Sequence, residues 1–258
     1  MKTRYSMVTA VVAVTVGFIF LSARGAAAQS DHVNALVSNG VKAVMEALRP
    51  QCERAIGHPI DMQFNTSVAL KQKIEAGDGF DVTILTSELI DDLTKQGKIE
   101  AGSRVDLARS GIGVGIRTGA PKPDIGTSGA MKQTLLNAKT ITYAQEGASR
   151  VYIEKMFESL GIADQVKSKI ILEMKPGQPQ INVAEGKADL VMTLVSEILP
   201  VHGIELLGPL PDDFQHYVSM AGGVGANAHD PQTAKAVLKF LSGPKAAPVF
   251  KAKVMEPL

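Results

Sequence analysis

The sequence predicts an α/β protein of two lobes, each a mainly parallel sheet flanked by helices, with a ligand cleft between the lobes. Short apolar segments alternate with helical ones, this alternation occurs twice, and extended segments at 106–115 and 216–223 can join the two halves. Parallel strands need crossover connections, which the helices provide. The expected organisation is a first part of lobe 1 at 29–108, lobe 2 at 109–217 and a C-terminal part of lobe 1 at 218–258.

Strand and helix alternate three times in the first half. Strands are expected at 32–38, 60–65 and 80–86, and helices at 41–56, 67–77 and 87–97. The first helix contains Pro50, which removes a backbone donor and crowds the preceding turn, so a break or bend is expected there. A glycine-punctuated extended segment at 104–124 then interrupts the alternation.

The second half repeats the pattern. Strands are expected at 140–144, 169–174 and 188–194, followed by helices that begin at Arg150, around 182–186 and at Ser196. The helix from Arg150 has apolar residues at the spacing of one buried face. After an extended segment at 209–228, the last helix is expected to have Asp230 as its cap, Pro231 in its first position and Gly243 past its end.

Residues 1–28 are typical of a secretory signal peptide. Lys2 and Arg4 precede an uncharged run at 8–21, and three alanines at 26–28 provide a small-residue cleavage site. No later segment approaches the about 18 apolar residues of a membrane span, so we expect a soluble, exported chain. Removing 28 of the 258 residues leaves 230, enough for one large domain or two small ones.

Composition and motifs argue against several classes of function. Without Lys2, Arg4 and Arg24 of the signal, the 27 basic residues fall to 24 against 26 acidic ones, so nucleic-acid binding is not expected. The single cysteine, Cys52, has a helical spacing that favours buried packing over a reactive thiol. The glycines at 111–115 lack the context of a dinucleotide site and are expected to let a crossing strand pass closely against its neighbours. Metal-binding, phosphate-loop and nucleophile-elbow motifs are lacking, so no metal or cofactor is expected.

Ligands of open α/β sheets bind beyond the carboxyl ends of the strands, where the next helices begin. Five such junctions are predicted, at 38–40, 65–67, 86–87, 147–150 and 193–196. Their Ser, Thr, Asn and Gly residues also suit helix caps, which contribute about 1 kcal/mol each, and capping alone explains 86–87. Ser38, Thr66 and Ser67 are favoured as a set because neighbouring turns with hydroxyls and free N–H groups form an anion cradle.

Arg150 stands at the start of a predicted helix, where a cation is unfavourable because the helix dipole is already positive there. It therefore requires an anionic partner. Two partners are open: a bound anion, or an acidic neighbour, Glu146 or Glu154, in a surface ion pair.

Three segments carry a resemblance to a known family: "FNTSVALKQKIEAGDGFDVTIL" at 64–85, "YIEKMFESLG" at 152–161 and "FLSGPKAAPVFK" at 240–251. With them, most of the chain after the signal resembles the periplasmic molybdate-binding proteins of ABC importers, which have the type II periplasmic binding fold. The resemblance implies a periplasmic location and an ABC importer membrane component as partner. We expect a monomer, because a capture protein works by lobe closure and gains nothing obvious from a partner subunit. By position, Ser38 and Thr66 or Ser67 fall where that family's serines hold the oxyanion, and Ser149 where a backbone N–H does so.

Departures from the family's pattern change the expected ligand. The family's second-lobe tyrosine falls near Leu194, and the small residue after its N–H donor is replaced by Arg150. The segment approaching the next ligand position contains Lys175, Pro176 and Gly177. Cations with long reach suit carboxylates, which guanidinium binds bidentately. We therefore expect a small organic anion with more than one carboxylate. Binding of molybdate or tungstate is the third interpretation, after the enzymatic one described next.

The second interpretation is enzymatic. Some periplasmic proteins that resemble this family isomerise aconitate, a tricarboxylate, by cofactor-free proton transfer. This reaction needs carboxylate clamps and a base beside an acidic C–H, and the candidate bases are Glu146, Lys175 and His216. A solute-binding protein and such an isomerase share the fold, the signal and the pocket. The candidate ligand-binding residues are Ser38, Asn39, Thr66, Ser67, Ser149, Arg150 and Lys175.

Overall fold

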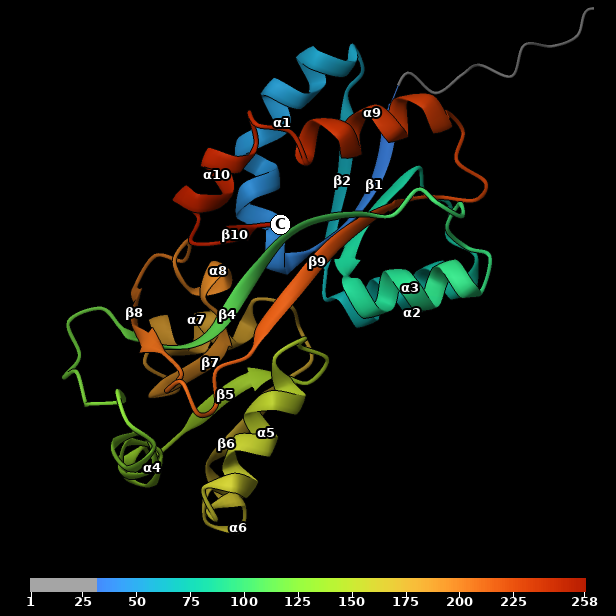
Figure 1. Ribbon diagram of the computed structural model, residues 1–258. Helices are drawn as coiled ribbons and strands as arrows, with labels where there is room; N and C mark the ends of the chain where they lie inside the picture. The colour runs from blue at the N-terminus through green and yellow to red at the C-terminus, as the bar shows by residue number, and fades with distance from the viewer. Residues whose placement is uncertain (1–31) are drawn as a thin grey trace, which may run out of the picture.

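The computed structural model describes residues 32–258, so the predicted signal peptide at 1–28 lies outside the described residues. Two α/β halves are joined by two long strands, β4 (Val105–Arg117) and β9 (Tyr217–Val224), which run diagonally through the molecule in Figure 1. The predicted two-lobed α/β fold is confirmed. Within residues 32–258, no helix has the length and apolar character needed to cross a bilayer.

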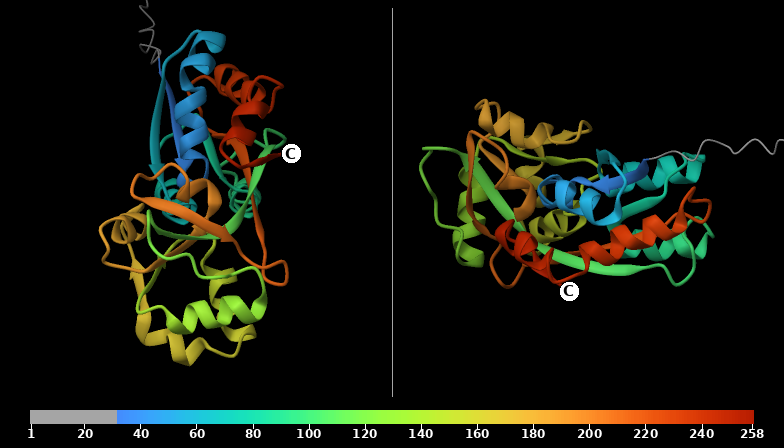
Figure 2. Two further views of the ribbon diagram at one scale, coloured as in Figure 1. Left: turned by 90° about the vertical axis from the view of Figure 1, so that its left-hand side faces the viewer. Right: turned by 90° about the horizontal axis from the view of Figure 1, so that it is seen from above.

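The first half is a parallel sheet covered on both faces. Its strands lie in the order β2 (Ile60–Asn65), β1 (Val33–Ser38), β3 (Val82–Thr86). One face carries α1 (Lys42–Ile56), α9 (Pro231–Leu241) and α10 (Ala247–Ala252), and the other carries α2 (Ser67–Ala76) and α3 (Ser87–Lys95), as Figure 2 shows. Alternate residues of β1 supply the two faces: Ala35 and Val37 pack with α1, and Leu36 packs with α2 and α3.

The second half is a smaller sheet in which β5 (Ile141–Ala144) lies parallel to β6 (Ile170–Glu173) and β7 (Leu190–Leu194). The remaining elements of the chain are β8 (Ile204–Pro209), β10 (Glu256–Pro257), α4 (Ser128–Asn137), α5 (Arg150–Ser159), α6 (Ala163–Val166), α7 (Gln178–Ala184), α8 (Val195–Ile198) and the 3-10 helices η1 (Asn39–Val41) and η2 (Lys167–Lys169).

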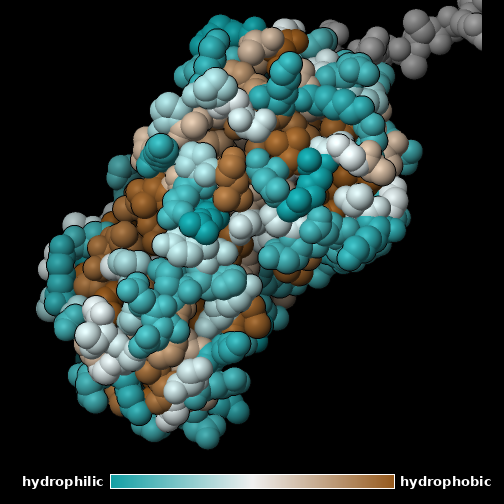
Figure 3. Space-filling view, in the orientation of Figure 1, coloured by the Kyte–Doolittle hydropathy of each residue, from teal (hydrophilic) through white to brown (hydrophobic). Residues whose placement is uncertain are grey.

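The face of the molecule seen in Figure 3 is mainly hydrophilic and is interrupted by hydrophobic patches.

Two details differ from the sequence-based expectations. Pro50 lies at an exposed position inside α1, and the helix continues through it, so of the expected break or bend the structure rules out the break. Helix α4 follows the Pro/Gly-rich turn, at a place where the sequence analysis assigned no helix. The Thr127 side chain caps this helix by accepting a hydrogen bond from the Ala130 N–H (3.1 Å). The last helix is as expected, since the Asp230 side chain accepts hydrogen bonds from the Gln232 and Thr233 N–H groups.

Strand β4 belongs to both halves. Its first part pairs antiparallel with β9, from Val105 opposite Gly222 to Gly111 opposite Tyr217, and its second part pairs with β7 and β8. The sheet order β2-β1-β3-β9-β4-β7-β5-β6 is therefore continuous. The predicted boundaries at 108/109 and 217/218 fall inside these shared strands, and the division of the chain into lobes by residue stays a prediction.

The glycines of β4 allow the close approach that the sequence predicted. A methyl group added at Gly113 would lie 2.9 Å from Val195 Cγ2 and 3.0 Å from the Gly208 carbonyl oxygen. One added at Gly115 would lie 2.8 Å from Val191 Cγ1 of β7 and 3.1 Å from Ile198 Cγ2 of α8. These distances to carbon are shorter than normal van der Waals contact, so α8 and β7 pack on β4 as closely as they do only because these side chains are absent.

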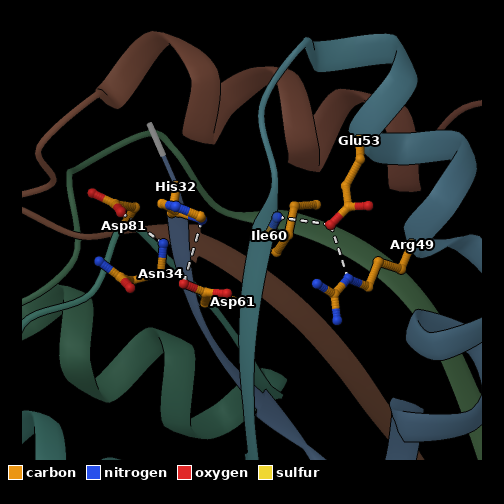
Figure 4. Close-up of polar contacts among 7 residues, drawn as sticks. All are labelled: His32, Asn34, Arg49, Glu53, Ile60, Asp61 and Asp81. Carbon is orange, nitrogen blue, oxygen red and sulfur yellow. Dashed lines mark hydrogen bonds and ion pairs between the residues drawn. The ribbon is translucent and has the colours of Figure 1, made fainter. Parts of the chain in front are cut away.

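Two carboxylates fasten the end of the first half that lies away from the second (Figure 4). Glu53 accepts a hydrogen bond from the Ile60 N–H (2.9 Å) and so joins the end of α1 to the start of β2. This hydrogen bond lowers the pKa of Glu53 the most, and a second one from the Arg49 side chain lowers it further, so that the pKa lies below its usual range. The buried Asp81 carboxylate accepts from the Asn34 N–H (2.8 Å), which ties the chain before β3 to β1.

Replacing Gly113 by alanine is expected to lower the free energy of unfolding by about 1 to 3 kcal/mol, because a backbone carbonyl faces the new methyl group. The matched control is Gly129→Ala in α4, where a Cβ would meet nothing within 4 Å. That variant should be as stable as wild type or up to about 1 kcal/mol more stable. Urea denaturation measures both, and equal stability of the two variants would contradict the close packing of β4.

Cys52 is buried in α1 with 1% exposure, as its spacing predicted, and burial raises the pKa of its thiol to about 12. Because the thiolate is the reactive form, the folded protein should react with a disulfide reagent only as fast as it unfolds. A disulfide reagent that releases a coloured thiol measures the rate of reaction of Cys52, compared with and without urea. Rapid stoichiometric reaction of the native protein would show an accessible thiolate instead.

Candidate functional site

A cavity of about 390 Å³ lies between the two halves, and both contribute to its wall. Four of the five predicted strand-to-helix junctions line it. In Figure 1 the carboxyl ends of β1 and β2 point toward the half that contains β5 and β7, which places these junctions opposite one another. The lining residues from the junctions are Ser38, Asn39, Thr66, Ser67, Gly147, Ala148, Thr193, Leu194 and Ser196.

Ser38 ends β1 and presents a hydroxyl group to the cavity. Its Oγ accepts hydrogen bonds from the Gly40 N–H (3.3 Å) and from the Ser67 hydroxyl (2.9 Å), and both serines are buried. A hydroxyl has one donor and two acceptor positions. With both acceptor positions used, the Ser38 proton is left to donate to an anion in the cavity.

Thr66 follows β2 and caps α2. Its Oγ1 accepts a hydrogen bond from the Ala69 N–H (3.1 Å), so helix capping, the alternative explanation for this junction, applies to Thr66. Capping uses the oxygen as an acceptor and leaves the hydroxyl proton to donate. The same group can therefore hold the helix start and contact an anion.

The second half contributes the turn between β5 and α5. Within it, the Gly147 N–H bonds to the Ala144 carbonyl oxygen (3.2 Å) and the Arg150 N–H bonds to the Gly147 carbonyl oxygen (3.1 Å). Gly147 and Ala148 line the cavity, whereas the buried Ser149, expected there through its N–H, is the next residue along and does not line it. The turn just before α5 thus forms this part of the wall, whereas the N-cap Ser149 and the first helical residue, Arg150, do not line it.

Buried hydrogen bonds of Ser196 join the halves beside the cavity. The Ser196 hydroxyl donates to the Gly40 carbonyl oxygen (2.8 Å), and the Ser196 N–H donates to Ser110 Oγ (3.3 Å). A second contact between the halves is more exposed, from Gln72 Nε2 to Glu146 Oε1 (3.5 Å). The first of these bonds sets the position of α8 relative to η1.

Among the described residues, three ionisable side chains line the cavity: Lys42, Glu46 and Glu197. The half-exposed Lys42 amine lies 3.8 Å from a Glu46 carboxylate oxygen and 5.4 Å from the centre of the Phe64 ring. The Glu197 carboxylate accepts hydrogen bonds from the Thr193 hydroxyl and the Leu194 N–H. Burial raises the pKa of Glu197, and these two hydrogen bonds act in the opposite direction.

Arg150 has an acidic neighbour as its partner. Its Nε lies 2.8 Å from Glu154 Oε1, one helical turn along α5, and its Nη1 donates to the Gln145 carbonyl oxygen (2.9 Å). The Tyr143 hydroxyl also donates to Glu154 (3.4 Å). Arg150 does not line the cavity, and of the two partners that the sequence left open, the structure has the surface ion pair.

The three candidate bases do not line the cavity either. Lys175 is exposed in the turn after β6, although its neighbours Pro176 and Gly177 line the wall. Glu146 contacts Gln72, as described above. His216 stacks on Tyr152 with ring centres 3.5 Å apart, and burial lowers the pKa of His216. The expected long-reach cations are thus outside the cavity in this conformation.

Lys42 and Glu197 were missed by the sequence analysis, although a signal for both exists. Lys42 is the first residue of α1 after the junction at 38–40, and Glu197 directly follows the junction at 193–196. Extending each junction by a few residues into its helix would have included both. Among residues 32–258, no group of three His, Cys, Asp or Glu side chains is placed to hold a metal ion.

Comparisons with known proteins identify a family for this chain and several proteins that it resembles. A family model described as bacterial extracellular solute-binding protein matches residues 33–255. The chain is 30% identical over 230 residues to the aconitate isomerase of Pseudomonas sp, covering 86% of this chain and 87% of that protein. It is 26% identical over 260 residues to the molybdate-binding protein ModA of Azotobacter vinelandii, covering 96% and 97%. The solved periplasmic molybdate-binding protein of Azotobacter vinelandii has a TM-score of 0.74 and 19% identity, covering 86% of this chain and 98% of that one.

The Thr66 cap of α2 should contribute more to the free energy of unfolding than the ion pair between Arg150 and Glu154 does. Thr66→Ala removes the α2 cap and is expected to lower the free energy of unfolding by about 1 kcal/mol. Arg150→Ala should change it by less than about 0.5 kcal/mol, because exposed ion pairs contribute little and this arginine opposes the helix dipole. Thermal or urea denaturation without ligand measures both, and a larger loss in Arg150→Ala would show that its ion pair holds the α5 turn in place.

Proposed function

This chain belongs to the bacterial extracellular solute-binding proteins, and from that premise we propose that its cavity captures a small organic anion with more than one carboxylate. The protein would act in the periplasm and deliver the anion to the membrane component of an ABC importer. The observation that carries the proposal is the cradle of neutral donors, to which both halves contribute.

The cradle suits an anion because of its geometry. Ser38 and Thr66 each have a hydroxyl proton available, and the start of α2 and the turn before α5 meet the cavity from opposite halves. Helix starts carry unpaired N–H groups and the positive end of the helix dipole. Closure of the two halves around an anion would surround it with such donors, as in hinged binding proteins.

The size of the cavity favours an organic anion over a tetrahedral oxyanion. At about 30 Å³ per water molecule in the liquid, a cavity of about 390 Å³ has room for about a dozen waters. That space suits a molecule with several carbon atoms and more than one carboxylate. Leu194 in the wall offers methyl groups and no side-chain donor, which further suits a ligand with a carbon skeleton.

Lys42 is the cation that we assign to the ligand, in the place expected for Arg150 and Lys175. Lys42 lines the cavity, and its amine lies 3.8 Å from a Glu46 carboxylate oxygen, a distance longer than a direct hydrogen bond. A ligand carboxylate could therefore compete for it. One flexible ammonium beside neutral donors would bind one end of a polycarboxylate, while the cradle binds the other.

A second candidate function is isomerisation of aconitate. It is favoured by the 30% identity to an aconitate isomerase and by Glu197, a carboxyl group in the cavity wall. In that reaction a base removes a proton from the methylene carbon, the double bond shifts along the carbon chain, and a proton is returned at the other end. Glu197 is placed to exchange such a proton, whereas Glu146, Lys175 and His216 lie outside the cavity.

Calorimetry with the purified mature protein tests the proposal. We expect trans-aconitate to bind more tightly than succinate, and molybdate to bind most weakly, because the cavity has room and a cation for a second carboxylate. Chromatography of the trans-aconitate mixture over time then separates the two functions, since appearance of the cis isomer shows turnover. Preferred binding of molybdate would reject the organic anion.

Lys42→Gln is expected to weaken binding of the best carboxylate by about twofold to fivefold, the range for a partly exposed ionic contact. Lys175→Gln provides the comparison, since Lys175 is exposed and outside the lining. Calorimetry of the two variants ranks the two lysines. A larger loss at Lys175 would return the ligand contact to the residue that the sequence favoured.

A further inference from the structure

The cavity proposed for an anion has a carboxyl group in its wall with no cation beside it. Lys42, the one basic side chain of the lining within the described residues, lies 3.8 Å from Glu46 and is half exposed. Glu197 is contacted instead by two neutral donors, the Thr193 hydroxyl and the Leu194 N–H. An ionised Glu197 would repel a bound anion across a cavity from which the ligand displaces water.

The elements that pack on α8 do not supply a counter-charge to Glu197. Neither η1 nor β7 has an ionisable side chain, and α1 brings Lys42 and Glu46 to the cavity. The charged residues of β4 and β8 lie outside the lining, and they are Asp106, Arg109, Arg117 and Glu205. Three of them are paired elsewhere: Asp106 with Arg104, Arg109 with Glu256, and Glu205 with Lys122.

We propose that Glu197 is a neutral carboxylic acid when an anion occupies the cavity, and that it donates its proton to the anion in a hydrogen bond. This inference rests on the proposed function and adds a chemical requirement to it: capture of the anion is linked to a proton on the protein. The acid would give the cavity a side-chain O–H donor on the wall where Leu194 offers only methyl groups. Burial, which raises the pKa of Glu197, acts in the same direction.

Linkage fixes the sign of the pH dependence. If the complex requires the protonated acid, binding is strongest at a pH where Glu197 already carries its proton and weakens as rising pH removes that proton from the free protein. One proton per ligand gives a limiting slope of about tenfold in Kd per pH unit. The anion would thus be released more easily at alkaline pH.

Glu197 also has a structural role, which the test must hold constant. It is the third residue of α8, and its bond to the Leu194 N–H at the N-cap is one half of a capping box. Glutamine serves that position as well as glutamate does. Glu197→Gln therefore keeps the cap and the shape of the side chain while removing the ability to ionise.

The experiment measures Kd by calorimetry between about pH 6 and pH 9 for wild type and Glu197→Gln, with trans-aconitate as probe and molybdate as a second probe. We expect the wild-type Kd to rise with pH toward the tenfold slope, and the variant to keep the low-pH affinity within about threefold across the range. The titrations are repeated in buffers with different enthalpies of ionisation, which gives the number of protons that the protein takes up on binding. This number should be lower for the variant than for wild type. Titration of the ligand's own carboxylates is common to both proteins and cancels in the comparison.

Glu88→Gln is the matched control, because Glu88 is an exposed acid in the first turn of α3, outside the cavity. It should keep the wild-type slope. The same pH dependence in wild type and Glu197→Gln, or a loss of more than tenfold in the affinity of Glu197→Gln at low pH, would overturn the inference while leaving capture of the anion intact. Binding of neither probe to wild type would reject the proposed function and this inference together.

Discussion

The antiparallel pairing of β4 with β9 is the constraint on which the rest of the structure depends. These strands carry the chain between the halves, and β4 continues from its pairing with β9 into pairing with β7 and β8. Sheet hydrogen bonds thus connect the two parallel sheets through one shared strand. The glycines of β4 are part of this constraint, since α8 reaches the strand only where no side chain intervenes.

The position of the cavity follows from that arrangement. Strands of a parallel sheet end at one edge, so the junctions after β1 and β2 lie together, as do those after β5 and β7. Joining the sheets through β4 and β9 turns these two edges toward each other. The buried bond from the Ser196 hydroxyl to the Gly40 carbonyl oxygen then sets how closely the halves meet beside the cavity.

The cavity combines neutral donors with very little positive charge. Hydroxyl groups and helix starts can stabilise an anion without a cluster of basic residues, because their dipoles are held in place by the fold. Charge in the wall then becomes a means of discrimination. If the cavity captures a polycarboxylate, the half-exposed Lys42 would bind a carboxylate at the rim, and the partly buried Glu197 would make occupancy sensitive to protons.

The sequence by itself determined the features that depend on neighbours along the chain. These are the alternation of strand and helix, the Asp230 cap, the buried Cys52 and the junctions, four of which line the cavity. Only the tertiary structure decided which charges reach the cavity. Arg150 begins a helix beside the cavity, yet its side chain bonds to Glu154 one turn along, whereas Lys42 and Glu197 enter the wall from α1 and α8. The local pattern of residues specifies where a helix begins. The direction of a long side chain depends instead on how its helix is rotated against the sheet and on the partners that packing brings within reach.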